Sequence, residues 1–172
     1  MSWGWWIALA VVATASVIDW RTRRIPNLIT FPLALGALVA NGVVGGGVGV
    51  GAAAIGLVVG LLIFFVLVML KAMGPGDAKL MAGLGALLGI VNVFWIGLFT
   101  CVMGGLLAVL YSLGQKSFPR MVHRTGELVK HIVLTGKLPK ADELNPTRED
   151  YMPYALAIAL GVTAQYLYRG GS

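Results

Sequence analysis

The chain has 172 residues, of which 58% are hydrophobic and only 12% are charged, and its formal net charge is +6. A soluble domain carries about 25% charged residues, so this composition and the mean hydropathy of +0.86 exclude a soluble protein and predict an integral membrane protein. The lone cysteine, Cys101, excludes an internal disulfide and a multi-cysteine zinc site. In a soluble chain the basic excess would suggest nucleic acid; here it indicates membrane topology, and no nucleic-acid partner is expected.

Six apolar runs are expected to cross the bilayer as helices of one all-α membrane domain that covers residues 1–172. A crossing takes about 20 apolar residues, with tilt or local thinning of the bilayer where a run is shorter. The first run ends without a small-residue cleavage site, so it is expected to remain as an anchor and not to be removed as a signal peptide. The expected spans are residues 3–18, 28–44, 48–70, 80–91, 93–114 and 152–168.

The basic residues predict the orientation of these spans. A turn near Asn92 between the fourth and fifth spans puts the connecting segments 19–27, 71–79 and 115–150 on one side of the membrane, and these segments contain twelve of the thirteen Lys and Arg residues. Because basic loops stay in the cytoplasm, this side is expected to be cytoplasmic, with both chain termini on the other side.

Two further patterns concern helix packing and the long cytoplasmic segment. Glycines spaced four apart, such as Gly56 with Gly60 and Gly85 with Gly89, let helix backbones approach closely in lipid, and the glycine-rich stretch 42–51 is a candidate turn between the second and third spans. Residues 120–133 place apolar side chains on one helical face and charged ones on the other, which predicts an amphipathic helix on the inner leaflet.

Asp19 and Asp77 are the only acidic residues in the first 126, and each lies at the edge of an apolar run. A charge at the end of a membrane span costs roughly 3 kcal/mol unless something pairs with it or uses it, so both positions are candidate functional sites. Each has a structural alternative, Asp19 as an interfacial flank and Asp77 as a helix cap in a first turn. Neither alternative requires the two acids to share a membrane face.

The two segments that hold these aspartates contain residue types suited to tight turns and helix starts. The residues expected to support the aspartates are Pro26, Asn27, Gly74, Gly76 and Lys79. Lys79 is two residues from Asp77, so on a helix the two side chains diverge, and a supporting or lipid-headgroup role is expected for it in place of catalysis.

Residues 74–80 read Gly-Pro-Gly-Asp-Ala-Lys-Leu, and Asp19 lies six residues ahead of an Ile-Pro-Asn element at 25–27. This combination resembles the prepilin peptidases, which are membrane aspartic proteases of type IV pilus systems. The resemblance covers most of the chain, including the Pro-Tyr element at 153–154, and the short length is similar to the minimal peptidases of tight-adherence pilus systems.

The resemblance implies an enzyme of the bacterial inner membrane that cleaves the short basic leader from prepilins and pseudopilins at the cytoplasmic face, with Asp19 and Asp77 as the catalytic pair. Two carboxyl groups held close together cannot both ionise readily, so one keeps a proton while the other deprotonates the attacking water. The sequence does not say which aspartate takes which role, and it does not give the oligomeric state. No metal or cofactor is expected, because the chain has neither a cysteine cluster nor a His-Glu-x-x-His element.

Larger prepilin peptidases carry an additional cytoplasmic region with paired cysteines and also methylate the new pilin N-terminus. With one cysteine in this chain, methyltransferase activity is not expected. Two other classes stay open: a proton-coupled carrier, which should place its carboxylates near mid-bilayer on broken helices, and a non-enzymatic pilus assembly subunit, which needs no paired acids. Intramembrane proteases of the presenilin type share Gly-x-Gly-Asp, but there the first aspartate follows a tyrosine inside a span, whereas Ile18 precedes Asp19 here.

Overall fold

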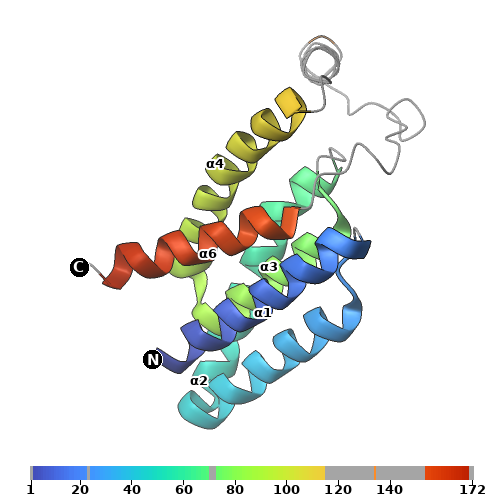
Figure 1. The fold of residues 1–172 in the computed structure, drawn as a ribbon. Coiled ribbons are helices and arrows are strands. Elements are labelled where there is room, and N and C mark those ends of the chain that lie inside the picture. Colours follow the sequence, from blue (N-terminus) through green and yellow to red (C-terminus); the bar gives the residue numbers. More distant parts are fainter. Residues whose placement is uncertain (1, 23, 70–72, 115–133, 135–153, 171–172) are drawn as a thin grey trace. The chain divides into compact units, whose positions relative to one another are not determined.

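The computed structural model describes residues 2–22, 24–69, 73–114, 134 and 154–170, and every regular element in them is a helix (Figure 1). The helices are α1 (Ser2–Thr22), α2 (Asn27–Met69), α3 (Pro75–Leu88), α4 (Ile90–Gly114) and α6 (Tyr154–Gly170). Three helical stretches are long and apolar enough to cross a membrane, namely Trp3–Thr22, Asn27–Phe65 and Ile90–Leu110. The expected all-α membrane class is therefore confirmed. The amphipathic helix expected at 120–133 and most of the polar segment 115–150 lie outside the described residues.

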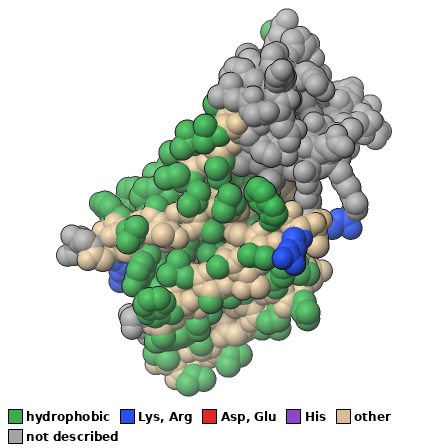
Figure 2. Space-filling model, in the orientation of Figure 1, with side chains coloured by type: hydrophobic (Ala, Val, Ile, Leu, Met, Phe, Trp, Pro, Cys, Tyr) green, Lys and Arg blue, Asp and Glu red, His purple; other side chains and the backbone are tan. Residues whose placement is uncertain are grey.

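The chain forms two compact parts, Met1–Gly104 with Pro153–Ser172, and Gly105–Met152. The contacts described below all lie within the first part. There, large apolar side chains such as Leu28, Val43 and Val48 are more than 80% exposed. Figure 2 shows that hydrophobic side chains cover much of the face presented by the described helices. Such a surface suits contact with lipid chains, and it would be unfavourable in water.

α1 is longer than the expected span 3–18, because it continues through Asp19 to Thr22. Asp19 was expected in the connecting segment; this was wrong, since its carboxyl group lies in the last turns of a helix. The Thr22 hydroxyl closes that end: it lies 2.9 Å from the carbonyl oxygens of both Ile18 and Arg24 and donates its single proton to one of them at a time. The longer helix holds the Asp19 side chain on the rigid α1 scaffold.

α2 contains the second and third expected spans, joined at a sharp bend. Gly46 at the bend has φ 59° and ψ −144°, a conformation that glycine adopts far more readily than other residues. A Cβ added at Gly49 would overlap the carbonyl oxygen of Asn41, eight residues earlier. Residues eight apart in a straight helix are about 12 Å apart, so the chain folds back on itself here. The turn expected within residues 42–51 is confirmed.

A second break separates α3 from α4, and it lies at Gly89, with φ 85° and ψ 170°. The sequence-based position near Asn92 was wrong by three residues. Glycine accommodates the positive φ of the break, whereas Asn92 belongs to the first turn of α4, where its side-chain Nδ2 donates to the Leu88 carbonyl oxygen at 2.7 Å.

α3 is the most buried helix of the described part, with almost every residue from Asp77 to Ala86 shielded. It packs against both legs of α2, and glycines make the contact close. A Cβ added at Gly56 would overlap the carbonyl oxygen of Gly85, one added at Gly85 would overlap that of Gly56, and one at Gly60 would overlap that of Met81. The expected packing role is confirmed for these three glycines.

Replacing Gly85 with alanine tests this packing. The added methyl group must push the α2 and α3 backbones apart, and overpacking of this kind typically costs roughly 1–3 kcal/mol. We expect Gly85→Ala to lower the thermal unfolding temperature of the purified protein in detergent. Gly51→Ala is the matched control, because a Cβ there meets nothing within 4 Å, so it should be neutral or stabilising by up to about 1 kcal/mol. Equal stability of the two variants would contradict the close α2–α3 contact.

Candidate active site

Asp19 and Asp77 lie at the same end of the described helices, and each is only 6% exposed. The antiparallel arrangement of α1 and α3 explains this. Gly4 at the start of α1 lies against Leu87 and Leu88 at the end of α3, so the end of α1 meets the start of α3. Asp19 comes close enough to Asp77 for its charge to act on the second carboxyl group. The two are the only acidic residues in the described part of the chain.

Asp19 faces the first turn of α6. The backbone N–H of Ala155 donates to Asp19 Oδ2 at 3.3 Å, in a buried position. One turn earlier on α1, the Ser16 hydroxyl lies 2.9 Å from the Ala155 carbonyl oxygen and 2.7 Å from the Val12 carbonyl oxygen, and its single proton is donated to one of them at a time. Unpaired amides and the helix dipole give a helix N-terminus a partial positive charge, so the start of α6 offers a favourable position for an acidic side chain.

Asp77 occupies the first turn of α3, as the sequence predicted. Its Oδ2 accepts a hydrogen bond from the Gly74 backbone N–H at 3.2 Å, and its own N–H donates to the Gly74 carbonyl oxygen at 3.2 Å. Its Oδ1 is buried and has no hydrogen-bond partner among the described residues. A buried carboxylate oxygen without a donor is unfavourable; protonation reduces this cost, and contact with a water or substrate group removes it.

The environment of Asp77 favours its protonated form. Asp77 comes before the span expected at 80–91, and it lies outside the three apolar stretches that are long enough to cross a membrane. Burial, followed by the negative charge of Asp19, raises the pKa of Asp77 from 3.8 to about 7, although the Gly74 hydrogen bond acts in the opposite direction. The structure therefore favours a proton on Asp77 near neutral pH.

The expected supporting residues join the turn before α2 to the start of α3. Lys79 Nζ donates to Asn27 Oδ1 at 3.0 Å, and a Cβ added at Gly76 would lie 3.1 Å from Ile25 Cβ and 3.2 Å from its carbonyl oxygen. The start of α2 is closed by a hydrogen bond from the Ile29 N–H to the Pro26 carbonyl oxygen at 3.1 Å. These contacts hold the turn before α2 against the start of α3.

Lys79 has a second contact on α2. Besides Asn27, its ammonium group lies 5.7 Å from the centroid of the Phe31 ring, an arrangement suited to a cation–π interaction. Lys79 thus contacts the first turns of α2.

The sequence interpretation missed the contribution of α6 and Ser16. Tyr154 opens α6 and packs against Gly104, where an added Cβ would lie 3.0 Å from Tyr154 Cε1, and it interacts electrostatically with Asp77. Two signals were present in the sequence: a proline before the first residue of an apolar helix, and a hydroxyl side chain one helical turn before Asp19. Neither signal shows that α6 meets the end of α1, since that depends on tertiary packing.

No group of three or more His, Cys, Asp and Glu side chains suited to a metal ion occurs among the described residues. The absence of a metal requirement stays a prediction.

The model of the type IV leader peptidase family matches residues 6–109, which include both aspartates. The chain belongs to this family. A prepilin leader peptidase/N-methyltransferase of Aeromonas hydrophila is 38% identical over 97 residues, which make up 51% of this chain and 33% of that protein. One from Aeromonas salmonicida (strain A449) is 33% identical over 123 residues, 65% of this chain and 40% of that protein. The matched part is thus less than half of each relative's length. No solved structure matches the chain.

Proposed function

We propose that this chain is an aspartic endopeptidase that removes the short basic leader from type IV prepilins and pseudopilins. The observation that carries the proposal is the pair of buried carboxyl groups, Asp19 and Asp77, brought together from two helices at one end of the bundle. Membership of the type IV leader peptidase family and the names of the two relatives support the substrate class.

In the proposed mechanism, ionised Asp19 takes a proton from a water whose oxygen attacks the scissile carbonyl carbon. Protonated Asp77 donates to the carbonyl oxygen as negative charge develops there. The tetrahedral intermediate then collapses: the proton held by Asp19 passes to the leaving amine, and a hydroxyl proton of the intermediate returns to Asp77. The two groups titrate as a pair, so these roles describe where the shared proton mostly resides.

The supporting residues are proposed to position the pair without touching the reacting atoms. Gly74 donates its amide to Asp77, Gly76 permits the close approach to Ile25, and Lys79 binds Asn27 next to Pro26. Reacting groups must be held to within fractions of an ångström, because a displacement of about 1 Å can cost roughly 100-fold in rate.

We further propose six membrane crossings in the bacterial inner membrane, with both termini outside the cytoplasm and the aspartates at the cytoplasmic face. The fold-back at Gly46 and the break at Gly89 provide turns within α2 and between α3 and α4. The one-sided distribution of Lys and Arg supports the orientation. An amphipathic helix at 120–133 would then lie on the inner leaflet, and the lipid bilayer and prepilins would be the partners.

The position of the aspartates argues against a proton-coupled carrier, the main alternative from another class. A carrier places its coupling carboxylates near mid-bilayer on interrupted helices, whereas this pair lies at helix ends. A non-enzymatic assembly subunit would have no use for a buried carboxyl group held in its protonated form. The methyltransferase activity in the relatives' names is not extended to this chain.

Removal of either carboxylate tests the proposal. We expect Asp19→Asn and Asp77→Asn each to abolish leader removal from a purified prepilin, because the amide cannot exchange the proton. The double variant should be scarcely worse than either single one, since groups that act as a unit are strongly non-additive. Asp77→Glu keeps the charge but moves the carboxyl group, and should lose roughly 100-fold in rate.

Asp142→Asn and Glu149→Gln, which remove acids from the polar segment 115–150, are the controls for charge loss and should retain activity. Each variant is checked by thermal unfolding. Near-normal cleavage by a folded Asp77→Asn protein would reduce that residue to a helix cap and reject the protease proposal.

The pH profile of cleavage provides a second test. The mechanism needs Asp77 protonated and Asp19 ionised, and the pKa of Asp77 is raised to about 7. As pH rises above this value the catalytic proton is lost, so kcat/KM should fall by about tenfold per pH unit. Initial rates measured from pH 5 to pH 9 in buffers of constant ionic strength provide the profile. A rate that kept rising from pH 7 to pH 9 would contradict a protonated carboxyl group in the active form.

A further inference from the structure

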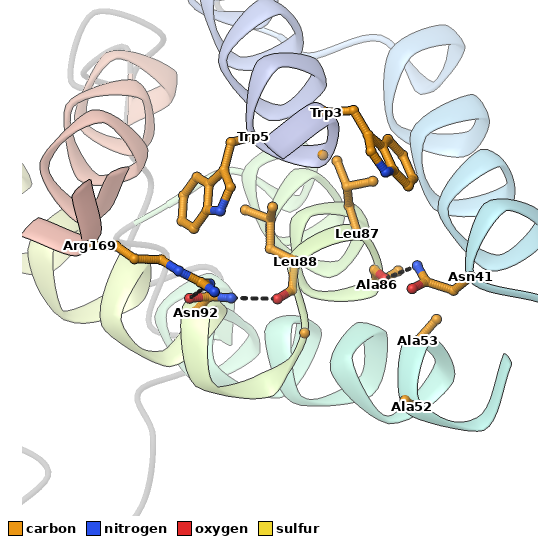
Figure 3. A pocket seen from close by; sticks show the side chains of 12 residues that line it. Trp3, Trp5, Asn41, Ala52, Ala53, Ala86, Leu87, Leu88, Asn92 and Arg169 are labelled. Atoms are coloured by element: carbon orange, nitrogen blue, oxygen red, sulfur yellow. Dashed lines mark hydrogen bonds between the residues drawn. The ribbon is translucent and has the colours of Figure 1, made fainter. Parts of the chain in front are cut away.

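A partly open cavity of about 300 Å³ lies at the end of the described helices opposite to the aspartates. Its walls come from the start of α1, both legs of α2, the end of α3, the start of α4 and the end of α6 (Figure 3). Cavities that bind small molecules start at about this size. The cavity takes no part in the chemistry proposed above, because Asp19 and Asp77 lie at the other ends of α1 and α3.

The cavity combines apolar walls with one cation and two amides. Arg169, near the end of α6, donates from Nη1 to Asn92 Oδ1 at 3.3 Å, and Asn92 is itself fixed by its hydrogen bond to Leu88. The side chain of Asn41, in α2, is fixed because its Nδ2 donates to the carbonyl oxygens of Ala37 at 2.9 Å and Ala86 at 3.1 Å. Figure 3 shows the Arg169 guanidinium beside Asn92, with the Trp5 ring nearby. The amides are therefore oriented before any ligand arrives.

Aromatic side chains gather at this end of the helices. Trp5 and Trp6 contact Tyr166 with ring centroids 5.8 and 6.1 Å apart, and Trp95 contacts Tyr168 at 6.2 Å. Trp6 is 63% exposed and Tyr168 64% exposed. Because Trp and Tyr concentrate at the level of lipid headgroups, this cluster indicates that the cavity lies at headgroup depth. An arginine in such a position directs its charge toward the headgroups.

We propose that this cavity binds the phosphate group of an anionic phospholipid, with Arg169 as its main ligand. The planar guanidinium matches phosphate oxygens in a way that a single ammonium cannot. The lipid is the favoured source of the phosphate because exposed apolar side chains in the same helix ends, such as Trp6 in α1 and Leu167 in α6 at 66%, offer a surface for its acyl chains.

A lipid bound here would contact five helices at once and so stabilise the folded bundle. The proposal depends on insertion in a membrane and not on the peptidase chemistry, so it can fail while the proposed function stands.

The test is thermal unfolding of the full chain in detergent, with added phosphatidylglycerol, phosphatidylcholine or inorganic phosphate. A ligand present at about a hundred times its dissociation constant stabilises the state that it binds, and for a protein of this size we expect phosphatidylglycerol to raise the unfolding temperature by about 5–10 °C. Phosphatidylcholine and inorganic phosphate should each have a much smaller effect. Native mass spectrometry of the same samples should show one retained phosphatidylglycerol.

Three variants locate the effect. Arg169→Gln should lose most of the phosphatidylglycerol shift, and Ala52→Leu, which fills the cavity from α2, should lose it with the charge intact. Arg24→Gln, which removes an exposed cation from the aspartate end, is the matched control and should keep the shift. The proposal is overturned if Arg169→Gln keeps the shift, if Arg24→Gln loses as much, or if phosphatidylcholine or inorganic phosphate alone stabilises the protein equally.

Discussion

The burial of two carboxyl groups beside each other is the constraint on which the rest of the structure depends. Raising the pKa of Asp77 from 3.8 to about 7 corresponds to on the order of 4 kcal/mol against its ionised form. This is a large fraction of the net stability of a typical domain, which is about 5–15 kcal/mol. The pair persists only because other contacts hold its two helices together and supply donors to both carboxyl groups.

Those contacts come from three directions. Glycines in α2 and α3 let the two backbones come into contact. This contact holds α3, and with it Asp77, against α2. The first turn of α6 binds Asp19 through the Ala155 amide. The contact of Lys79 with Asn27 joins the start of α3 to the start of α2. Local hydrogen bonds alone could cap a helix, but they could not bring two acids on different helices to one place.

Much of this arrangement was predictable from the sequence, because it follows from local rules. Two acids at the edges of apolar runs indicated a shared site, the glycine-rich stretch predicted the fold-back, and helix-start residues predicted the beginning of α2 at Asn27. Other features depend on tertiary packing and were missed or misplaced. α1 continues through Asp19, whose side chain contacts a helix that begins more than 130 residues later. The second break occurs at Gly89 because the backbone there needs a positive φ.

An infrared titration of the carboxyl groups tests the central claim most directly, since the C=O stretch of a protonated acid reports its ionisation without any substrate. In the purified wild-type protein, one carboxyl band that is absent from Asp77→Asn should persist up to about pH 7. In Asp19→Asn the same band should disappear at a lower pH, because the neighbouring negative charge is gone. If Asp77 instead titrated near its ordinary value of 3.8 in the wild-type protein, and did so unchanged in Asp19→Asn, the two aspartates would not form a pair.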